Sequence, residues 1–207
     1  MTASNFNLIL ASQSPRRIEL LKAAGFDFEV APANIEETVA PAWSPEECVC
    51  ELARNKAACV MQRVLATAGS VSRQEPATTV ILAADTVVAL EREIFGKPRD
   101  RQDAYRILYA LSHHPHRVIT GVCLWPTTRS EPLIAFDVTR IRMRAMTDAE
   151  IWAYIDTGEG MDKAGAYALQ ETGERYVAQI EGAFDNVVGL PIALVRQLLA
   201  QWQQERR

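Results

Sequence analysis

The stretch Val80-Ile81-Leu82-Ala83-Ala84-Asp85-Thr86-Val87-Val88-Ala89-Leu90 decides the fold class. Its first apolar run predicts a strand that is buried on both faces. Asp85 and Thr86 interrupt the apolar pattern, so we expect the strand to end there. In open α/β sheets ligands collect beyond the carboxyl ends of strands, and a buried carboxylate needs a cation or a basic partner. Asp85 is therefore a candidate site residue, and an Asp that merely starts a turn is the alternative.

Capping signals predict helices on both sides of this strand. Ser14 and Pro15 are typical of the first positions of a helix, and Ser44 with Glu47 has capping-box spacing. The expected elements are strands over residues 8–11, 80–84, 117–125 and 133–144 and helices that begin after Ser14, Ser44, Asp100 and Thr147 and at Pro191. This order predicts an α/β fold, a mixed twisted sheet with flanking helices.

The composition restricts the class of ligand. A chain of 207 residues with 48% hydrophobic content and a net charge of −4 suits a compact enzyme but has no basic field for nucleic acid. No apolar run approaches the roughly 18 residues that cross a bilayer, and the four cysteines contain no C-x-x-C pair. We expect a cytoplasmic protein of one domain over residues 1–207, with a small-molecule ligand, no nucleic-acid partner and no membrane contact.

The segment from Ser12 to Arg17 is a candidate anion site. It lies where a strand leads into a helix, whose first N–H groups are free and whose dipole favours negative charge. Arg16 and Arg17 add planar donors that suit phosphate oxygens. The alternative is that Ser14 only caps the helix and both arginines are surface charges.

Further candidates are charged or amide side chains near predicted loops. Glu36 and Glu37 supply oxygen ligands for Mg²⁺ together with Asp85, although adjacent glutamates are usually solvated. Lys56 lies on an otherwise apolar helix face, which indicates either a cleft or a stem lying along the surface. The remaining candidates are Lys97 in a Gly-Lys-Pro loop, Lys163 and Gln170 in DKAGAYALQ, and the segment from Gly182 to Pro191.

The three histidines, His113, His114 and His116, surround Pro115 in a predicted loop. No second ligand cluster accompanies them, so we expect an exposed or capping role rather than a transition-metal site. The segment Thr67–Thr79 lacks apolar periodicity and predicts a solvated loop.

Together these motifs resemble the Maf family of nucleotide pyrophosphatases. The similar blocks, in chain order, are LASQSPRRIELL, IEE, ELARNKA, LAADTVV, FGKPRD, DKAGAYALQ and NVVGLP. The resemblance implies a two-lobed fold with a central cleft, related to inosine triphosphatases and often dimeric, so a homodimer is expected. It also implies a nucleoside triphosphate as substrate and a divalent metal cation, Mg²⁺ or Mn²⁺, as cofactor.

Site residues follow from the resemblance position by position. Asp85 matches a catalytic carboxylate that accepts a proton from water, and Glu37 matches an acidic residue of catalysis or metal binding. Both are thus expected metal ligands. Residues expected to bind the substrate are Ser14, Arg16, Arg17, Lys56, Thr86, Lys97, Lys163 and Gln170.

The branch of the family can also be predicted. Arg16, Thr86 and Gln170 resemble the branch that acts on dTTP and UTP and releases the monophosphate and pyrophosphate. Three alternatives stay open: a 7-methyl-GTP pyrophosphatase of the sister branch, a purine-directed enzyme of the inosine triphosphatase type, and a nucleotide-binding regulator of septum formation. The intact pair Glu37 and Asp85 favours catalysis over binding alone.

Overall fold

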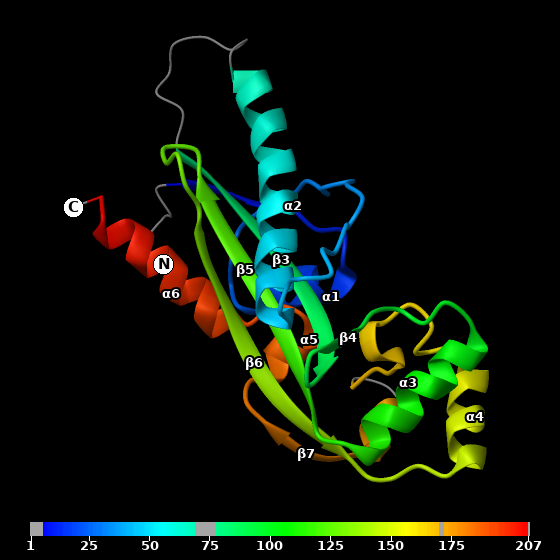
Figure 1. Ribbon diagram of the computed structural model, residues 1–207. Helices are drawn as coiled ribbons and strands as arrows, with labels where there is room; N and C mark the ends of the chain where they lie inside the picture. The colour runs from blue at the N-terminus through cyan, green and yellow to red at the C-terminus, as the bar shows by residue number, and fades with distance from the viewer. Residues whose placement is uncertain (1–5, 69–77, 170–171, 207) are drawn as a thin grey trace.

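The computed structural model describes residues 6–68, 78–169 and 172–206. In this part of the chain a seven-stranded mixed sheet carries helices on both faces (Figure 1), which confirms the predicted α/β class. The strands are β1 (Phe6–Leu10), β2 (Glu29–Val30), β3 (Thr78–Leu90), β4 (Glu93–Phe95), β5 (His116–Pro126), β6 (Leu133–Met143) and β7 (Val177–Glu181). The helices are α1 (Pro15–Ala23), α2 (Pro45–Ala68), α3 (Arg101–His113), α4 (Asp148–Thr157), α5 (Phe184–Val188) and α6 (Ile192–Gln204), with 3₁₀ turns η1 (Ala164–Ala166) and η2 (Thr172–Tyr176).

The strand order leaves part of one edge of β3 open. The sheet runs β2-β1-β3-β5-β6-β7, and β4 pairs separately with β3. The parallel β1 ladder ends where Leu10 lies opposite Leu82, and the antiparallel β4 ladder begins where Phe95 lies opposite Val88. Since β5 occupies the other edge of β3, no described strand pairs with β3 on this edge between Leu82 and Val88.

The prediction that a strand ends at Asp85 is wrong. β3 continues through this residue to Leu90 because β5 pairs with it throughout, with Asp85 opposite Gly121 and Thr86 opposite Thr120. A charged side chain is accommodated within the strand because it lies at the part of the edge that β1 and β4 leave open. The candidate site is therefore beyond the carboxyl end of β1, not of β3.

Alternate residues of β3 face opposite sides of the sheet, as the strand period requires. Leu82 and Ala84 pack in the cluster that includes Val195 of α6, whereas Ile81 and Ala83 pack in the cluster formed with α2. By the same alternation Asp85 faces α2 and Thr86 faces α1 and α5. A third cluster lies under α3 and α4 at the far end of the sheet (Figure 1).

Most helices begin at the predicted caps. The Ser44 N–H donates to Glu47 at 2.8 Å and the Ser44 hydroxyl accepts from the Glu47 N–H at 3.2 Å. Thr147 forms the second capping box and Asp100 accepts a hydrogen bond from the first turn of α3. Ser14 holds the N-cap position of α1, but its side chain makes no capping hydrogen bond. The hydroxyl of Ser14 is therefore not used by the helix.

No helix in the described ranges is long and apolar enough to cross a membrane. Cys48, Cys50, Cys59 and Cys123 are free thiols, and the first three lie on α2. The predicted loop after Thr67 starts later than expected, because α2 extends to Ala68. Most of that loop, residues 69–77, lies outside the described residues.

Candidate active site

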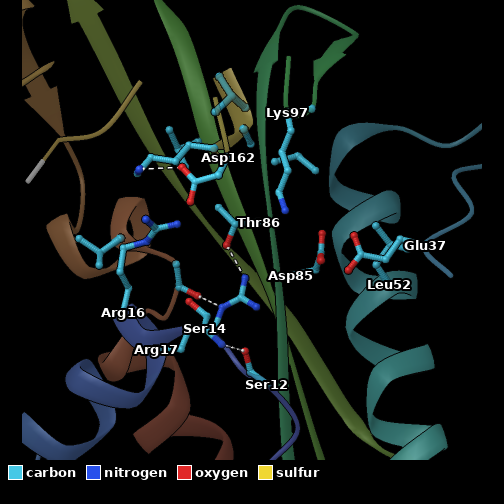
Figure 2. A pocket seen from close by; sticks show the side chains of 18 of the residues that line it. Ser12, Ser14, Arg16, Arg17, Glu37, Leu52, Asp85, Thr86, Lys97 and Asp162 are labelled. Atoms are coloured by element: carbon cyan, nitrogen blue, oxygen red, sulfur yellow. Dashed lines mark hydrogen bonds and ion pairs between the residues drawn. The ribbon is translucent and has the colours of Figure 1, made fainter. Parts of the chain in front are cut away.

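One cavity of about 850 Å³ collects almost all of the predicted site residues. It lies along the open edge of β3, between α1 and α2 (Figure 2). The predicted residues that line it are Ser14, Arg16, Arg17, Glu37, Lys56, Asp85, Thr86, Lys97 and Lys163. Gln170 lies outside the described residues. Gly189 of the segment from Gly182 to Pro191 also lines the cavity, as predicted.

Lys56 joins Asp85 and Glu37, two of the acidic residues that line the cavity. Its Nζ lies 2.5 Å from Asp85 Oδ1 and 2.7 Å from Glu37 Oε1. Lys56 and Asp85 are buried, whereas the Glu37 side chain is 52% exposed at the rim. Burial raises the pKa of the Asp85 carboxyl, and the charges of Lys56 and Arg17 only partly oppose that effect. Asp85 is thus a poorly solvated carboxylate that depends on neighbouring cations.

Arg17 is fixed on the opposite face of β3. Its Nε donates to the Gly189 carbonyl at 2.8 Å and its Nη2 donates to Thr86 Oγ1 at 3.0 Å. Burial lowers the pKa of this guanidinium, while the carboxylates of Asp85 and Glu37 raise it. An arginine remains protonated in proteins, so the remaining N–H groups of Arg17 present a fixed positive charge to the cavity.

The start of α1 adds further donors beside Arg17. Pro15 is at the first position of the helix, and no acidic residue occupies the first turn. The first N–H groups of a helix lack intrahelical partners and attract anions. Figure 2 shows the side chains of Ser14 and Arg16 next to Arg17 on this side of the cavity. Hydrogen-bond donors and positive charge of the kind that suits an anion therefore gather at the end of β1.

The upper wall of the cavity is formed by two loops that hydrogen-bond to each other. Lys97 is exposed and its side chain points into the cavity (Figure 2). The Gly165 N–H donates to the Gly96 carbonyl at 3.1 Å, and this hydrogen bond ties the loop of Lys97 to the segment that contains Lys163. Lys163 instead contacts Asp162 Oδ1 at 2.8 Å and the Glu159 carbonyl. Lys163 lines the cavity, but these contacts hold its ammonium group on its own loop.

The expectation of an exposed or capping role is wrong for His116. This residue is 2% exposed, and its Nε2 lies 2.9 Å from the Tyr167 hydroxyl. Burial lowers the pKa of His116 to about 4, so the ring is neutral at physiological pH. Tyr167 lines the cavity, and His116 therefore holds one aromatic wall of it in place.

Two polar residues behind the cavity were not identified from the sequence. The Thr120 hydroxyl contacts Thr86 Oγ1 at 3.0 Å and donates to the Asn186 carbonyl at 2.9 Å. Both residues are completely buried. Thr120 lies in an ordinary strand pattern, and nothing in the neighbouring sequence marks it as a functional residue. Asn186 belongs to the segment NVVGLP, which the sequence indicates as a candidate, but its hydrogen-bond partners could not be predicted.

The acidic residues of the cavity have the donor chemistry that a hard divalent cation prefers. Asp85 and Glu37 share one lysine ammonium, so both carboxylates face the same point. No group of three or more His, Cys, Asp or Glu side chains that could hold a metal occurs among the described residues. Among the described residues, Asp85 and Glu37 are therefore the candidate carboxylate ligands, and water and substrate oxygens would have to complete the coordination.

Comparisons with known proteins identify the family of this chain. A chain from Bdellovibrio bacteriovorus described as a dTTP/UTP pyrophosphatase is 45% identical over 195 residues, 94% of this chain and 98% of that protein. A Gloeobacter violaceus protein of the same description is 44% identical, over 95% of this chain and 96% of its own length. A solved nucleoside-triphosphatase (dITP/XTP pyrophosphatase) from Mycobacterium abscessus covers 96% of this chain and 98% of its own, but at 11% identity and a TM-score of 0.42 it supports no conclusion. The model of the family Maf-like protein matches residues 7–202, and this chain belongs to that family.

Proposed function

We propose that this protein hydrolyses dTTP and UTP between the α- and β-phosphates, releasing the nucleoside monophosphate and pyrophosphate. The observation that carries the proposal is the buried Asp85 carboxylate at the centre of a cavity whose other charged groups are largely cationic. The names of the relatives from Bdellovibrio bacteriovorus and Gloeobacter violaceus support the choice of substrates. We also propose that the chain acts as one two-lobed domain, because the strands on both sides of the cavity belong to one sheet.

Asp85 is the proposed general base. A carboxylate is a better base when its pKa is raised toward the working pH, and burial raises the pKa of Asp85. Lys56 holds this carboxylate at 2.5 Å and so fixes its orientation. In the proposed reaction Asp85 accepts a proton from the water that attacks the α-phosphorus atom. The bond from this atom to the oxygen that bridges the α- and β-phosphates breaks, and pyrophosphate is the leaving group.

The triphosphate would lie between the two positively charged sides of the cavity. Arg17 and the first N–H groups of α1 face it from one side, and Lys97 faces it from the other (Figure 2). Preorganised cations stabilise the charge that develops on phosphoryl oxygens in the transition state. Because Arg17 is already fixed by two hydrogen bonds, little reorganisation is needed when substrate binds.

A divalent cation is the proposed cofactor, and Asp85 and Glu37 are the residues that would hold it. When bound, such an ion neutralises phosphate charge and polarises the bond that breaks. Lys56 occupies the space between the two carboxylates in the structure, so its ammonium group would have to move aside for both to serve as ligands. The half-exposed Glu37 is free to follow such a movement.

The test is pyrophosphate release from dTTP, UTP, CTP, GTP and 7-methyl-GTP, each with Mg²⁺ or Mn²⁺. The wild type should act on dTTP and UTP, and Asp85→Asn should lose at least about a hundredfold in kcat, as expected for loss of a general base. Asp27→Asn is the matched control, because Asp27 is exposed and does not line the cavity.

The pattern of activity separates the alternatives. Turnover of 7-methyl-GTP instead of the pyrimidine nucleotides would move the protein to the sister branch of the family. Turnover of dTTP by Asp85→Asn at the rate of the wild type would remove Asp85 from its proposed role. No turnover of any triphosphate would refute the enzymatic proposal and favour a regulatory nucleotide-binding protein.

A further inference from the structure

Thr86 lines the cavity, but its hydroxyl makes hydrogen bonds to other residues of the protein. Thr86 Oγ1 accepts a hydrogen bond from Arg17 Nη2 at 3.0 Å and lies 3.0 Å from Thr120 Oγ1. Thr86 and Thr120 are direct cross-strand partners in the β3–β5 ladder, so the backbone keeps these two hydroxyls together. What Thr86 can offer a substrate depends on where its single hydroxyl proton points.

The direction of the protons follows from the last acceptor. A carbonyl oxygen accepts only, so the Thr120 hydroxyl must donate to the Asn186 carbonyl, at 2.9 Å. Each hydroxyl has one proton, and that of Thr120 is used for Asn186. The hydrogen bond between the two threonines is therefore donated by the Thr86 hydroxyl to Thr120 Oγ1. The chain runs one way, from the Arg17 guanidinium through Thr86 and Thr120 to the Asn186 carbonyl. Successive hydrogen bonds of this kind polarise and strengthen one another.

Asn186 is the fixed end of this chain. It is 0% exposed, and its Nδ2 donates to the Val118 carbonyl at 3.0 Å and to Thr139 Oγ1 at 2.9 Å. The Asn186 carbonyl also accepts from the Gly189 N–H at 3.1 Å. Since the Gly189 carbonyl holds Arg17 Nε, both anchors of the arginine lead back to Asn186. One buried asparagine thus connects β5 and β6, through its side-chain amide, to the cation of the cavity, through its main-chain carbonyl.

We propose that Thr86, Thr120 and Asn186 are positioning residues that act on the triphosphate through Arg17. This inference rests on the proposed function for its ligand. The Thr86 proton is committed to Thr120, so Thr86 has no donor left for a base carbonyl or a phosphate oxygen. Arg17, held at two points, is directed at phosphate, which all nucleotides share.

The experiment measures Thr86→Val, Thr120→Val and Thr86→Ser as single variants, and then measures Thr86→Val again in an Arg17→Met background. Binding of the non-hydrolysable α,β-imido analogues of dTTP and CTP is measured by calorimetry. Thr86→Val and Thr120→Val should each weaken binding of both analogues by the same factor, about two- to tenfold for one net hydrogen bond. Thr86→Ser, which keeps the hydroxyl, should bind like the wild type, and so should the exposed control Thr128→Val.

The arginine background decides between direct and indirect action. In Arg17→Met, Thr86→Val should cause no further loss, because the group it positions is gone. A loss that persists in this background, or one that changes the ratio of dTTP to CTP analogue binding, would overturn the inference. Thr120→Val that binds like the wild type would overturn it as well.

A readout without nucleotide separates this inference from the proposed function. Arg17 Nε–H donates to Gly189 inside the protein, so its exchange with solvent, followed by NMR of ¹⁵N-arginine-labelled protein, should be slow. Thr86→Val and Thr120→Val should each speed this exchange severalfold, whereas Thr128→Val should not. A protein that binds no triphosphate but shows this acceleration would refute the proposed function and retain the positioning role; unchanged exchange in both valine variants would refute the positioning role.

Discussion

Replacing Lys56 by Met should destabilise the protein in a strongly pH-dependent way. The change keeps most of the side-chain stem and removes the ammonium group 2.5 Å from Asp85 Oδ1 and 2.7 Å from Glu37 Oε1. The contact with the half-exposed Glu37 contributes little, since solvent screens it. The contact with Asp85 matters, because that carboxylate is 6% exposed and would lose its closest cation.

The size of the effect is limited by protonation of Asp85. Leaving a buried charge unpaired costs about 3–5 kcal/mol, but the carboxyl can take up a proton instead. Protonation of the carboxyl costs about 1.4 kcal/mol for each pH unit above the ordinary pKa near 3.9. The cost is about 4 kcal/mol at pH 7 and about 1.5 kcal/mol at pH 5. Lys56→Met should therefore lose about 3–4 kcal/mol at pH 7 and about 1.5 kcal/mol at pH 5.

The sign of the pH dependence follows from linkage. Burial already raises the pKa of Asp85 in the folded protein, and loss of Lys56 raises it further. Between the unfolded and the folded pKa the folded state holds a proton that the unfolded state has released, so stability falls as the pH rises. Lys56→Met should show a steeper fall than the wild type.

Urea unfolding at pH 5 and pH 7, followed by circular dichroism, measures these free energies. Lys56→Met combined with Asp85→Asn should recover much of the loss at pH 7, because no buried charge is then left unpaired. Lys22→Met, on an exposed position of α1, should change stability by less than about 0.5 kcal/mol. A loss below about 1 kcal/mol at both pH values, or an equal loss at both, would refute the reasoning.

Three further changes test the packing, the thiols and the caps. Gly121→Ala would place Cβ 2.5 Å from the backbone carbonyl group of Val49 in α2; we expect a loss of about 1–3 kcal/mol, and an unchanged melting temperature would contradict this close approach. Cys48 and Cys123 should resist Ellman's reagent at pH 8 until the protein is unfolded in urea, since burial raises their pKa to about 11 and about 12 and the thiolate is the reactive form. Asp100→Ala removes the acceptor at the start of α3 and should cost about 1 kcal/mol in chemical denaturation, whereas an exposed Asp27→Ala should not.

Local signals in the sequence were sufficient for most elements of the fold. Capping boxes such as Ser44 with Glu47 are predictable because both partners lie within one turn of chain. The inward position of Lys56 was predictable for a similar reason, since its neighbours on the helix face are apolar. The identity of its partners was not, because Glu37 and Asp85 lie far from Lys56 along the chain.

The sequence of β3 alone could not predict whether the strand ends at the charged residue Asp85 or continues through it. Asp85 interrupts the apolar pattern and therefore suggested an end, yet β3 continues because β5 pairs with it on the other edge. Whether a strand tolerates a charge depends on which neighbours cover that position. Here β1 ends at Leu10 and β4 begins to pair at Val88, and neither limit is encoded near Asp85.

The adjacent positions of Asp85 and Thr86 explain how one strand serves both sides of the cavity. Successive side chains point to opposite faces, so Asp85 meets Lys56 and Glu37 on the α2 face while Thr86 meets Arg17 on the α1 face. A shift of one residue in the β3 register would turn both side chains to the opposite faces of the sheet, so that Asp85 would leave Lys56 and Thr86 would leave Arg17. The ladder with β5 pairs ten consecutive residues of β3, from Val80 to Ala89, and so prevents that shift. The chemistry proposed for the cavity therefore depends on pairing along the whole strand as much as on the residues that line it.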